Sequence, residues 1–281
     1  MLRIAVPNKG ALSEPSISML KEAGYHQRRS TRELSFYDGE NGVEFFYIRP
    51  RDVAVYVGAG TVDVGITGRD LLLDSGAHAL EHRRLNFARS TFRFAAPEHT
   101  AQCVQDLQGK RIATSYDHLL REYLTKQQVQ AEVVHLDGAV ESSVRLGIAD
   151  AIADVVETGT TLRAAGLAVF GDPLLESEAV LIRRDGAEVT PELRILDGRL
   201  EGVIMARSYV VMDYDCHQDL LAQAVQVAPG YQSPTISPLH EEGWFAVRTM
   251  VERAKMNAVM DELHAIGARG IIVTPILTSR I

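Results

Sequence analysis

The chain has 281 residues, of which 46% are hydrophobic and 23% charged, values typical of a globular protein. This length exceeds one ordinary hydrophobic core, so two or three domains are expected. The 29 basic and 37 acidic residues give a net charge of −8, which argues against nucleic acid or an anionic membrane as the main partner. A phosphorylated ligand would therefore need a local basic pocket.

Targeting and cysteine signals are weak. The N-terminus passes directly into a β-rich segment, without the basic and long apolar regions of a secretory signal. No apolar run approaches the ~20 residues of a transmembrane helix. Cys103 and Cys216 are isolated, so neither a disulfide framework nor a structural zinc site is expected. These features predict a soluble cytoplasmic protein.

The first 90 residues alternate between strands, polar loops and helices. Strands are predicted at 2–6, 43–48 and 62–67, and helices at 12–23, 53–57 and 71–74. Such repeated units are typical of a parallel sheet with crossover helices. Lys9, Arg49 and Arg51 lie in the loops that follow the first two strands, and Asp70 follows the third.

The pattern changes near Ser90, where a crossover into a second lobe is expected. Strands are predicted there at 91–96, 111–114, 131–135 and 151–156, and helices at 119–127 and 140–146. A strand at 179–182 and a helix starting at Thr190-Pro191 are expected to return to the first lobe.

The last part of the chain has the order βαββαβ, which is typical of a ferredoxin-like domain. Its strands are predicted at 209–214, 235–237, 245–251 and 270–274, and its helices at 220–227 and 256–266. The predicted fold class is therefore α/β, with one lobe at 1–90 and 180–207, a second lobe at 91–179, and a ferredoxin-like domain at 208–281.

Residues 154–162 have the sequence DVVETGTTL, an apolar strand end that opens into a loop of threonine and glycine. Gly159 permits a tight turn, and consecutive N–H groups with three hydroxyls can bind an anion. The alternative is a plain strand-to-helix turn whose threonines cap the next helix. The loop alone leaves both interpretations open, although ligands in open α/β sheets bind beyond the carboxyl ends of strands.

The chain resembles the long, regulated form of ATP phosphoribosyltransferase in segments that follow one another along nearly its whole length. These are VPNKG at 6–10, DVGITGRD at 63–70, LDGAVE at 136–141, ADAIAD at 149–154, the loop at 154–162, and PGYQSPT at 229–235. The resemblance implies a two-lobed catalytic part like a periplasmic binding protein and a C-terminal regulatory domain that senses histidine. It also implies dimers that assemble into a hexamer.

The implied reaction is the first step of L-histidine biosynthesis. Adenine N1 of ATP attacks C1 of phosphoribosyl pyrophosphate, and pyrophosphate leaves. Because this nitrogen is largely unprotonated at neutral pH, the reaction needs positioning, anion stabilisation and Mg²⁺ more than a strong base. The resemblance implies that the substrate pyrophosphate mainly holds the Mg²⁺.

The resemblance also implies roles for particular residues. Asp154 and Glu141 would face the ribose hydroxyls as catalytic residues, and Lys9, Arg49 and Arg51 would neutralise phosphates from the first lobe. Asp70, Leu71 and Tyr116 are candidates for the nucleotide. The loop residues that would hold phosphate are Thr158, Gly159, Thr160 and Thr161. Glu157 and Leu162 complete the implied substrate-binding loop, with Glu157 pointing away from the phosphates or facing Mg²⁺. The alternatives are a turn or capping role for Asp154 and Glu141, and a place on the solvated surface for Lys9, Arg49 and Arg51. For Tyr116 the alternative is an ordinary tyrosine at the edge of the core.

The regulatory site implied by the resemblance contains Asp215, Tyr231, Ser233 and Thr235. The carboxylate would pair with a cationic amine or imidazole of L-histidine, and the hydroxyl groups would bind its polar ends. The alternative is a structural domain that serves only assembly.

Three positions depart from the family pattern: Ala11 replaces a common arginine, Glu157 replaces a small residue, and segment 86–88 lacks the expected glycines. Two other functions remain open, a non-catalytic small-molecule sensor and a phosphoribosyltransferase that acts on another nitrogen base.

Overall fold

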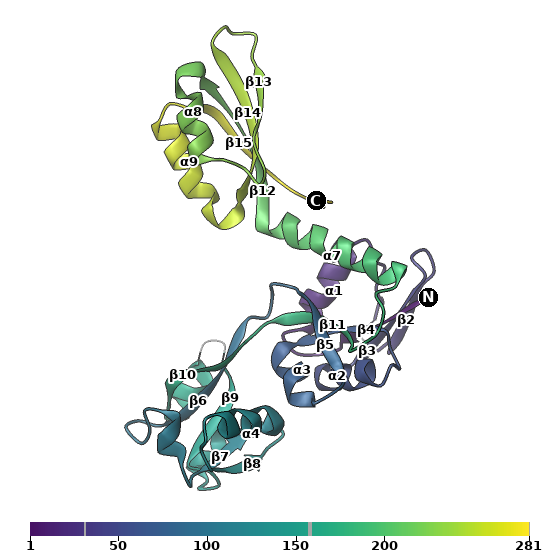
Figure 1. The fold of residues 1–281 in the computed structure, drawn as a ribbon, viewed down its shortest axis with the longest axis vertical. Coiled ribbons are helices and arrows are strands. Elements are labelled where there is room, and N and C mark those ends of the chain that lie inside the picture. The colour runs from purple at the N-terminus through teal and green to yellow at the C-terminus, as the bar shows by residue number, and fades with distance from the viewer. Residues whose placement is uncertain (31, 157–158, 281) are drawn as a thin grey trace. The chain divides into compact units, whose positions relative to one another are not determined.

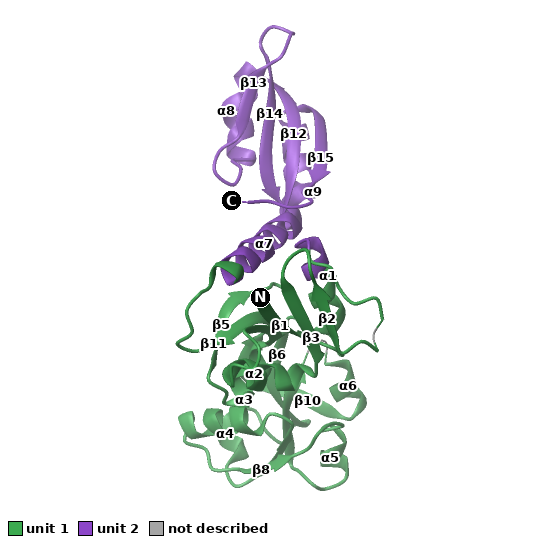
Figure 2. Cartoon of the chain, turned by 90° about the vertical axis from the view of Figure 1, so that its right-hand side faces the viewer, with its two compact units in different colours: residues 1–18, 25–192 green, residues 19–24, 193–281 purple. Residues whose placement is uncertain are grey.

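The computed structural model describes every residue except 31, 157–158 and 281 (Figure 1). The chain divides into two compact units (Figure 2). Unit 1 consists of residues 1–18 and 25–192, and unit 2 of residues 19–24 and 193–281. Within the described residues, we find no helix whose length and hydrophobicity would allow it to cross a membrane.

The first sheet of unit 1 has the strand order β2-β3-β1-β4-β11-β5. Its strands are β1 (Leu2–Pro7), β2 (Ser35–Asp38), β3 (Val43–Ile48), β4 (Val64–Gly68), β5 (Ala79–Arg84) and β11 (Ala179–Arg184). Strand β1 pairs in parallel with β3 and β4, whereas β2, β5 and β11 are antiparallel to their neighbours. The predicted parallel units therefore form the centre of a mixed sheet.

The helices that follow these parallel strands are α1 (Ser13–Glu22), α2 (Pro50–Gly58) and α3 (Arg69–Ser75). Every residue of β4 is buried, as expected for a central strand that is covered on both faces. Helix α2 packs so closely on this strand that a Cβ atom added at Gly65 would overlap Val53 and lie 3.1 Å from Val57 Cγ2. A glycine at this position therefore fixes the distance between helix and sheet.

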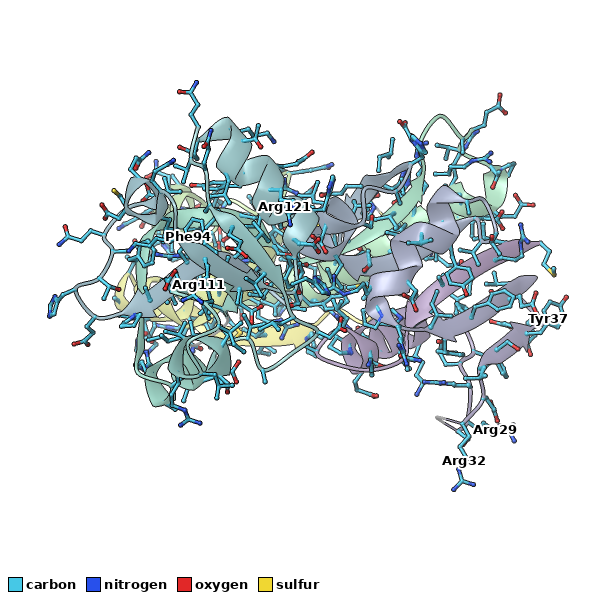
Figure 3. The ribbon with its side chains drawn as sticks, turned by 90° about the horizontal axis from the view of Figure 1, so that it is seen from below. Arg29, Arg32, Tyr37, Phe94, Arg111 and Arg121 are labelled. Atoms are coloured by element: carbon cyan, nitrogen blue, oxygen red, sulfur yellow. The ribbon has the colours of Figure 1, made fainter. Side chains whose placement is uncertain are left out.

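The second sheet of unit 1 has the strand order β10-β6-β9-β7-β8. Its elements are β6 (Ser90–Pro97), η1 (Val104–Leu107), β7 (Arg111–Thr114), α4 (Asp117–Lys126), β8 (Glu132–His135), α5 (Ser142–Arg145), β9 (Ala151–Val156), α6 (Thr160–Ala164) and β10 (Leu167–Ser177). One face of this sheet packs Phe92 and Phe94 against α4, and the other packs Ile152 against Leu162 of α6. Figure 3 shows Phe94 among the side chains of this layer.

Unit 2 consists of α7 (Pro191–Ser208), a sheet and two covering helices. The remaining elements are β12 (Tyr209–His217), α8 (Gln218–Val227), β13 (Thr235–Pro238), β14 (Trp244–Glu252), η2 (Arg253–Lys255), α9 (Met256–Ala265) and β15 (Arg269–Pro275). The antiparallel strands lie in the order β13-β14-β12-β15, and the predicted βαββαβ fold is confirmed. Helices α8 and α9 cover one face of the sheet (Figure 1), which leaves the other face open.

Helix α7 begins at Pro191, and the structure groups it with the sheet of unit 2. The guanidinium group of Arg207 donates two hydrogen bonds of 2.8 and 2.7 Å to the carboxylate of Glu22, which explains why the end of α1 belongs to unit 2 as well. The C-terminal segment also reaches α7, because Ser279 Oγ donates a 3.3 Å hydrogen bond to the carbonyl of Gly202. The assignment of residues 180–207 to the first lobe stays a prediction.

Candidate functional site

The parallel strands of unit 1 bring the predicted site residues to strand ends. In the first sheet, Pro7 of β1 lies beside Ile48 of β3, so Lys9 and Arg49 follow neighbouring strand ends. In the second sheet, β9 is parallel to β7, and Asp154 lies near its carboxyl end. This placement agrees with the rule that ligands bind beyond the carboxyl ends of strands.

Asp154 is partly buried, and its ionisation depends on its surroundings. The backbone N–H of Val155 donates a 2.7 Å hydrogen bond to Asp154 Oδ1. Burial and, to a smaller extent, the negative charges of Glu141 and Asp70 raise the pKa of Asp154 to about 6, against the opposing effects of the Val155 hydrogen bond and Arg51. The carboxylate is therefore mostly ionised at neutral pH but titrates close to it.

Tyr116 belongs to the same electrostatic group. It directly precedes α4, and its ring packs against Phe92 with 5.3 Å between ring centroids. Burial raises the pKa of Tyr116, and the negative charges of Asp70 and Asp154 and a hydrogen bond to Asp70 raise it further. The hydroxyl therefore keeps its proton and acts as a donor.

Asp70 and Arg51 extend this group into the first lobe. Asp70 is buried at the start of α3, where its Oδ1 accepts a 2.7 Å hydrogen bond from Ser177 Oγ. The guanidinium of Arg51 lies 4.9 Å from the ring centroid of Tyr116 and donates a 2.8 Å hydrogen bond to Asp74. Arg51 and Asp70 of the first lobe thus interact electrostatically with Tyr116 of the second lobe, within unit 1.

The phosphate loop is described only in part. Glu157 and Thr158 lie outside the described residues. Gly159 has a φ of 68°, a left-handed conformation that favours glycine, and it directly precedes α6. Thr160 and Thr161 are exposed in the first turn of α6, where backbone N–H groups have no helical partner. The phosphate-binding role of this loop stays a prediction.

The other predicted residues of unit 1 differ in exposure. Lys9 and Arg49 are exposed, and among the described residues neither forms an ion pair. Leu71 is partly buried on α3, and Glu141 is partly buried directly before α5. Leu162 is only 7% exposed and packs with the sheet, so its side chain contributes to the core and not to the loop surface.

Two features of this region were not predicted from sequence. Ser177 binds Asp70 across 107 residues of chain, a separation at which no local pattern signals contact. Arg69, next to Asp70, donates hydrogen bonds of 2.8 and 2.9 Å to Glu81 and lies 3.6 Å from Glu178. Together they tie α3 to the segments that connect the two lobes. By contrast, Arg29 and Arg32 point away from the ribbon (Figure 3).

Unit 2 contains a cavity of about 470 Å³ on its sheet. The residues that line it are Val211, Tyr231, Gln232, Ser233, Thr235, Arg248, Thr249, Met250 and Arg280. Three of the four residues predicted for an effector site, Tyr231, Ser233 and Thr235, are among them. Asp215 is not, although it lies on the same strand as Val211.

Two models of one protein family match consecutive parts of this sequence. The family model described as ATP phosphoribosyltransferase matches residues 49–202, and a model of the C-terminal domain of this family matches residues 206–278. The chain belongs to the ATP phosphoribosyltransferase family. It is accordingly a pentosyltransferase of the long form, because both models match one chain.

Individual relatives agree with this assignment. The chain is 64% identical to an ATP phosphoribosyltransferase of Kocuria rhizophila and 60% identical to one of Paenarthrobacter aurescens, each over the whole of both chains. A solved ATP phosphoribosyltransferase complex of HisG and HisZ from Thermotoga maritima superposes with a TM-score of 0.62 at 25% identity. The match covers 73% of this chain and 98% of that one. The two-lobed α/β fold expected for the family is confirmed.

Proposed function

We propose that this chain transfers the phosphoribosyl group of phosphoribosyl pyrophosphate to N1 of ATP and that L-histidine inhibits it. The observation that carries the catalytic part is the electrostatic group of Arg51, Asp70, Tyr116, Glu141 and Asp154. Both lobes of unit 1 contribute to this group, and it includes the strand that leads to Gly159. Family membership supplies the reaction class.

The proposed chemistry fits the charges of this group. A bond forms between adenine N1 and ribose C1, while the bond from C1 to the pyrophosphate oxygen breaks and its electron pair leaves with pyrophosphate. The ribose becomes cation-like, so the carboxylates of Asp154 and Glu141 can accept hydrogen bonds from its hydroxyls and stabilise positive charge. Asp154 can do so at neutral pH because its pKa of about 6 leaves it mostly ionised.

The phosphates require cations and N–H groups. Lys9 and Arg49 are exposed at strand ends and can bind phosphate oxygens, whereas Arg51 is already bound to Asp74. On the other lobe, the turn at Gly159 and the first turn of α6 offer N–H groups and the hydroxyls of Thr160 and Thr161. The two sets of residues would bind different ends of phosphoribosyl pyrophosphate, the 5-phosphate and the pyrophosphate.

We propose that Mg²⁺ binds together with the pyrophosphate. Among the described residues, no three His, Cys, Asp or Glu side chains converge as a protein-built metal site would require. Asp154 and Glu141 are close enough for their charges to interact, and Mg²⁺ at phosphate sites typically uses one or two carboxylates together with substrate oxygens and water. When bound, the ion would neutralise negative charge on the leaving pyrophosphate.

We place the proposed regulatory site on unit 2. Tyr231, Ser233 and Thr235 surround one cavity, and their hydroxyl groups can bind the polar ends of an amino acid. We also propose that the chain forms dimers that assemble into a hexamer, in which every chain carries its own regulatory site.

One assay tests both parts of the proposal. The protein is mixed with ATP, phosphoribosyl pyrophosphate and Mg²⁺, and formation of the N1-substituted adenine chromophore is followed with and without L-histidine. Product that forms and is suppressed by L-histidine supports the whole proposal. No product at any enzyme concentration would overturn the catalytic part, and product unaffected by histidine would overturn only the regulatory part.

The substitution Asp154→Ala is expected to lower turnover by about 100-fold, because it removes a carboxylate that acts on the developing charge. L-histidine affinity, measured by titration calorimetry, should change by less than about twofold. Asp172→Ala is the matched control, since Asp172 is an exposed aspartate of β10. If both variants kept full turnover, Asp154 would have no catalytic role.

A further inference from the structure

The cavity of unit 2 has a positive charge that was not predicted from the sequence. Its charged lining residues are Arg248 and Arg280, and among the described residues that line it there is no Asp or Glu. The effector residues predicted from sequence include no cation, so they leave the α-carboxylate of an amino acid without a charged partner. Desolvating a carboxylate without such a partner is costly.

Arg248 is placed to supply that partner. It lies on β14 opposite Asp213 of β12 and Thr235 of β13. Its Nε donates a 2.7 Å hydrogen bond to Asp213 Oδ1, which anchors one side of the guanidinium group. The side chain is 70% exposed, so the remaining N–H donors of its planar fork can bind a carboxylate in bidentate fashion.

Asp215, the acid predicted for the effector site, does not line this cavity. It follows Asp213 by two residues on β12, so it lies on the same open face of the sheet, about 7 Å further along the strand. Its neighbour on β14 is Ala246, whereas the cavity extends from Arg248 in the opposite direction along the strands, toward the pair of Val211 and Met250.

We propose that Arg248 binds the carboxylate of the amino-acid effector in the cavity of unit 2 and that Asp213 orients the guanidinium group. This assignment rests on the proposed regulation by L-histidine and adds a residue that determines specificity for an amino acid. Arg280 is a weaker candidate, because its Nη1 already donates a 2.8 Å hydrogen bond to the carbonyl of Ser279 in the C-terminal segment.

The test compares two ligands on the full-length protein by titration calorimetry. L-histidine has the carboxylate, whereas L-histidinol has the same amine and imidazole with a hydroxymethyl group in its place. Arg248→Gln is expected to weaken L-histidine binding by about 10-fold to 100-fold and L-histidinol binding by less than about threefold. Arg248→Lys should recover part of the loss because it keeps the charge but not the fork.

Arg121→Gln is the control for net charge, because it removes an arginine from the surface of α4 in unit 1. It should bind L-histidine as the unaltered protein does. Retained binding of L-histidinol by Arg248→Gln also reports that the variant is folded.

The outcomes separate this assignment from the proposed function. If the unaltered protein binds L-histidine and Arg248→Gln binds it equally well, the assignment of Arg248 is wrong and the regulatory proposal stands. Equal losses for L-histidine and L-histidinol would also overturn it, because the effect would then not depend on the carboxylate. If the unaltered protein binds no L-histidine, both proposals fail.

Discussion

Asp154 is a carboxylate in a setting that disfavours its charge. Burial and the nearby charges of Glu141 and Asp70 raise its pKa to about 6, although the Val155 N–H group and Arg51 partly compensate. In an unfolded chain an aspartate titrates near pH 3.9. The folded protein therefore binds this proton more tightly than the unfolded chain does, and charging Asp154 costs stability.

Asp154→Asn is expected to stabilise the protein at neutral and basic pH. Because the folded-state pKa is raised, the stabilising effect of the bound proton is complete below about pH 4 and is lost as the pH rises through about 6. The variant should exceed the unaltered protein in free energy of unfolding by about 1–2 kcal/mol near pH 8, and by less near pH 5. Urea unfolding at both pH values measures this difference.

An equal or lower stability of Asp154→Asn near pH 8 would contradict this expectation. Glu176→Gln is a suitable control, because Glu176 is an exposed carboxylate in the same unit. Asp154→Asn should also have a low turnover, since active sites commonly retain charges that reduce stability.

At this scale, local sequence predicts which residues follow strand ends but not which distant residues they contact. Lys9, Arg49, Asp70 and Asp154 could be placed because each follows or ends an apolar run. The partner of Asp70, Ser177, could not, because the contact depends on how two separate crossovers meet. Leu162 was assigned to the loop from its position, yet its apolar side chain is buried in the core.

Among the elements, the strands that were missed all lie at sheet edges, although the edge strands β8, β13 and β15 were predicted. Strands β3 and β7 begin and end where the sequence predicted, because each has buried apolar side chains and a neighbouring strand on both sides. Strands β2, β5 and β10 were missed. The first two lie at edges of their sheet, and β5 is mostly polar because water reaches it. Strand β10 contains Gly171 and Pro173 at a register shift, residues that locally indicate a turn.

Helix α7 offers a matched pair of glycines for a test. A Cβ atom added at Gly198 would meet no atom within 4 Å, whereas one added at Gly202 would overlap the Ser279 carbonyl and lie 2.6 Å from Arg280 Nη1. Gly198→Ala should raise the free energy of unfolding by about 0.5–1 kcal/mol through helix propensity. Gly202→Ala should lower it, by about 1–3 kcal/mol, because the C-terminal segment must move.

Chemical denaturation of the two variants under identical conditions measures the contrast. Stabilisation by both substitutions would show that the C-terminal segment does not pack on α7 in solution. Destabilisation by both would indicate that the helix has no room at Gly198.

At the scale of the whole molecule, the proposed catalytic and regulatory sites belong to different units. The charged group around Asp154 lies in unit 1, and the cavity that includes Thr235 and Arg248 lies in unit 2. Each ligand should therefore protect backbone amides mainly in its own unit, since binding suppresses local opening.

Hydrogen exchange followed by mass spectrometry tests this division. L-histidine should slow exchange by about tenfold in peptides from 209–275, and phosphoribosyl pyrophosphate with Mg²⁺ should do so in peptides that include 154–162. Protection by L-histidine confined to unit 1 would contradict the division. Exchange without ligand serves as the reference for both.

The order of domains could be predicted from the alternation of strands and helices and from the family resemblance, but their exact extent could not. The end of α1 falls in the same unit as α7, and Arg207 of α7 meets Glu22, a residue 185 positions earlier in the chain. No local pattern reports an ion pair across that distance. The same limit applies to Arg248, whose importance depends on the register of β14 with its two neighbouring strands.

The packing of the C-terminal segment on α7 has a practical consequence for protein production. Ser279 contacts Gly202, and Arg280 lines the cavity proposed for the effector. A purification tag fused to the carboxyl end would begin beside that cavity and could compete with the ligand or displace the segment. At the other end, Met1 is 70% exposed, so a cleavable amino-terminal tag is the better choice for measuring effector binding.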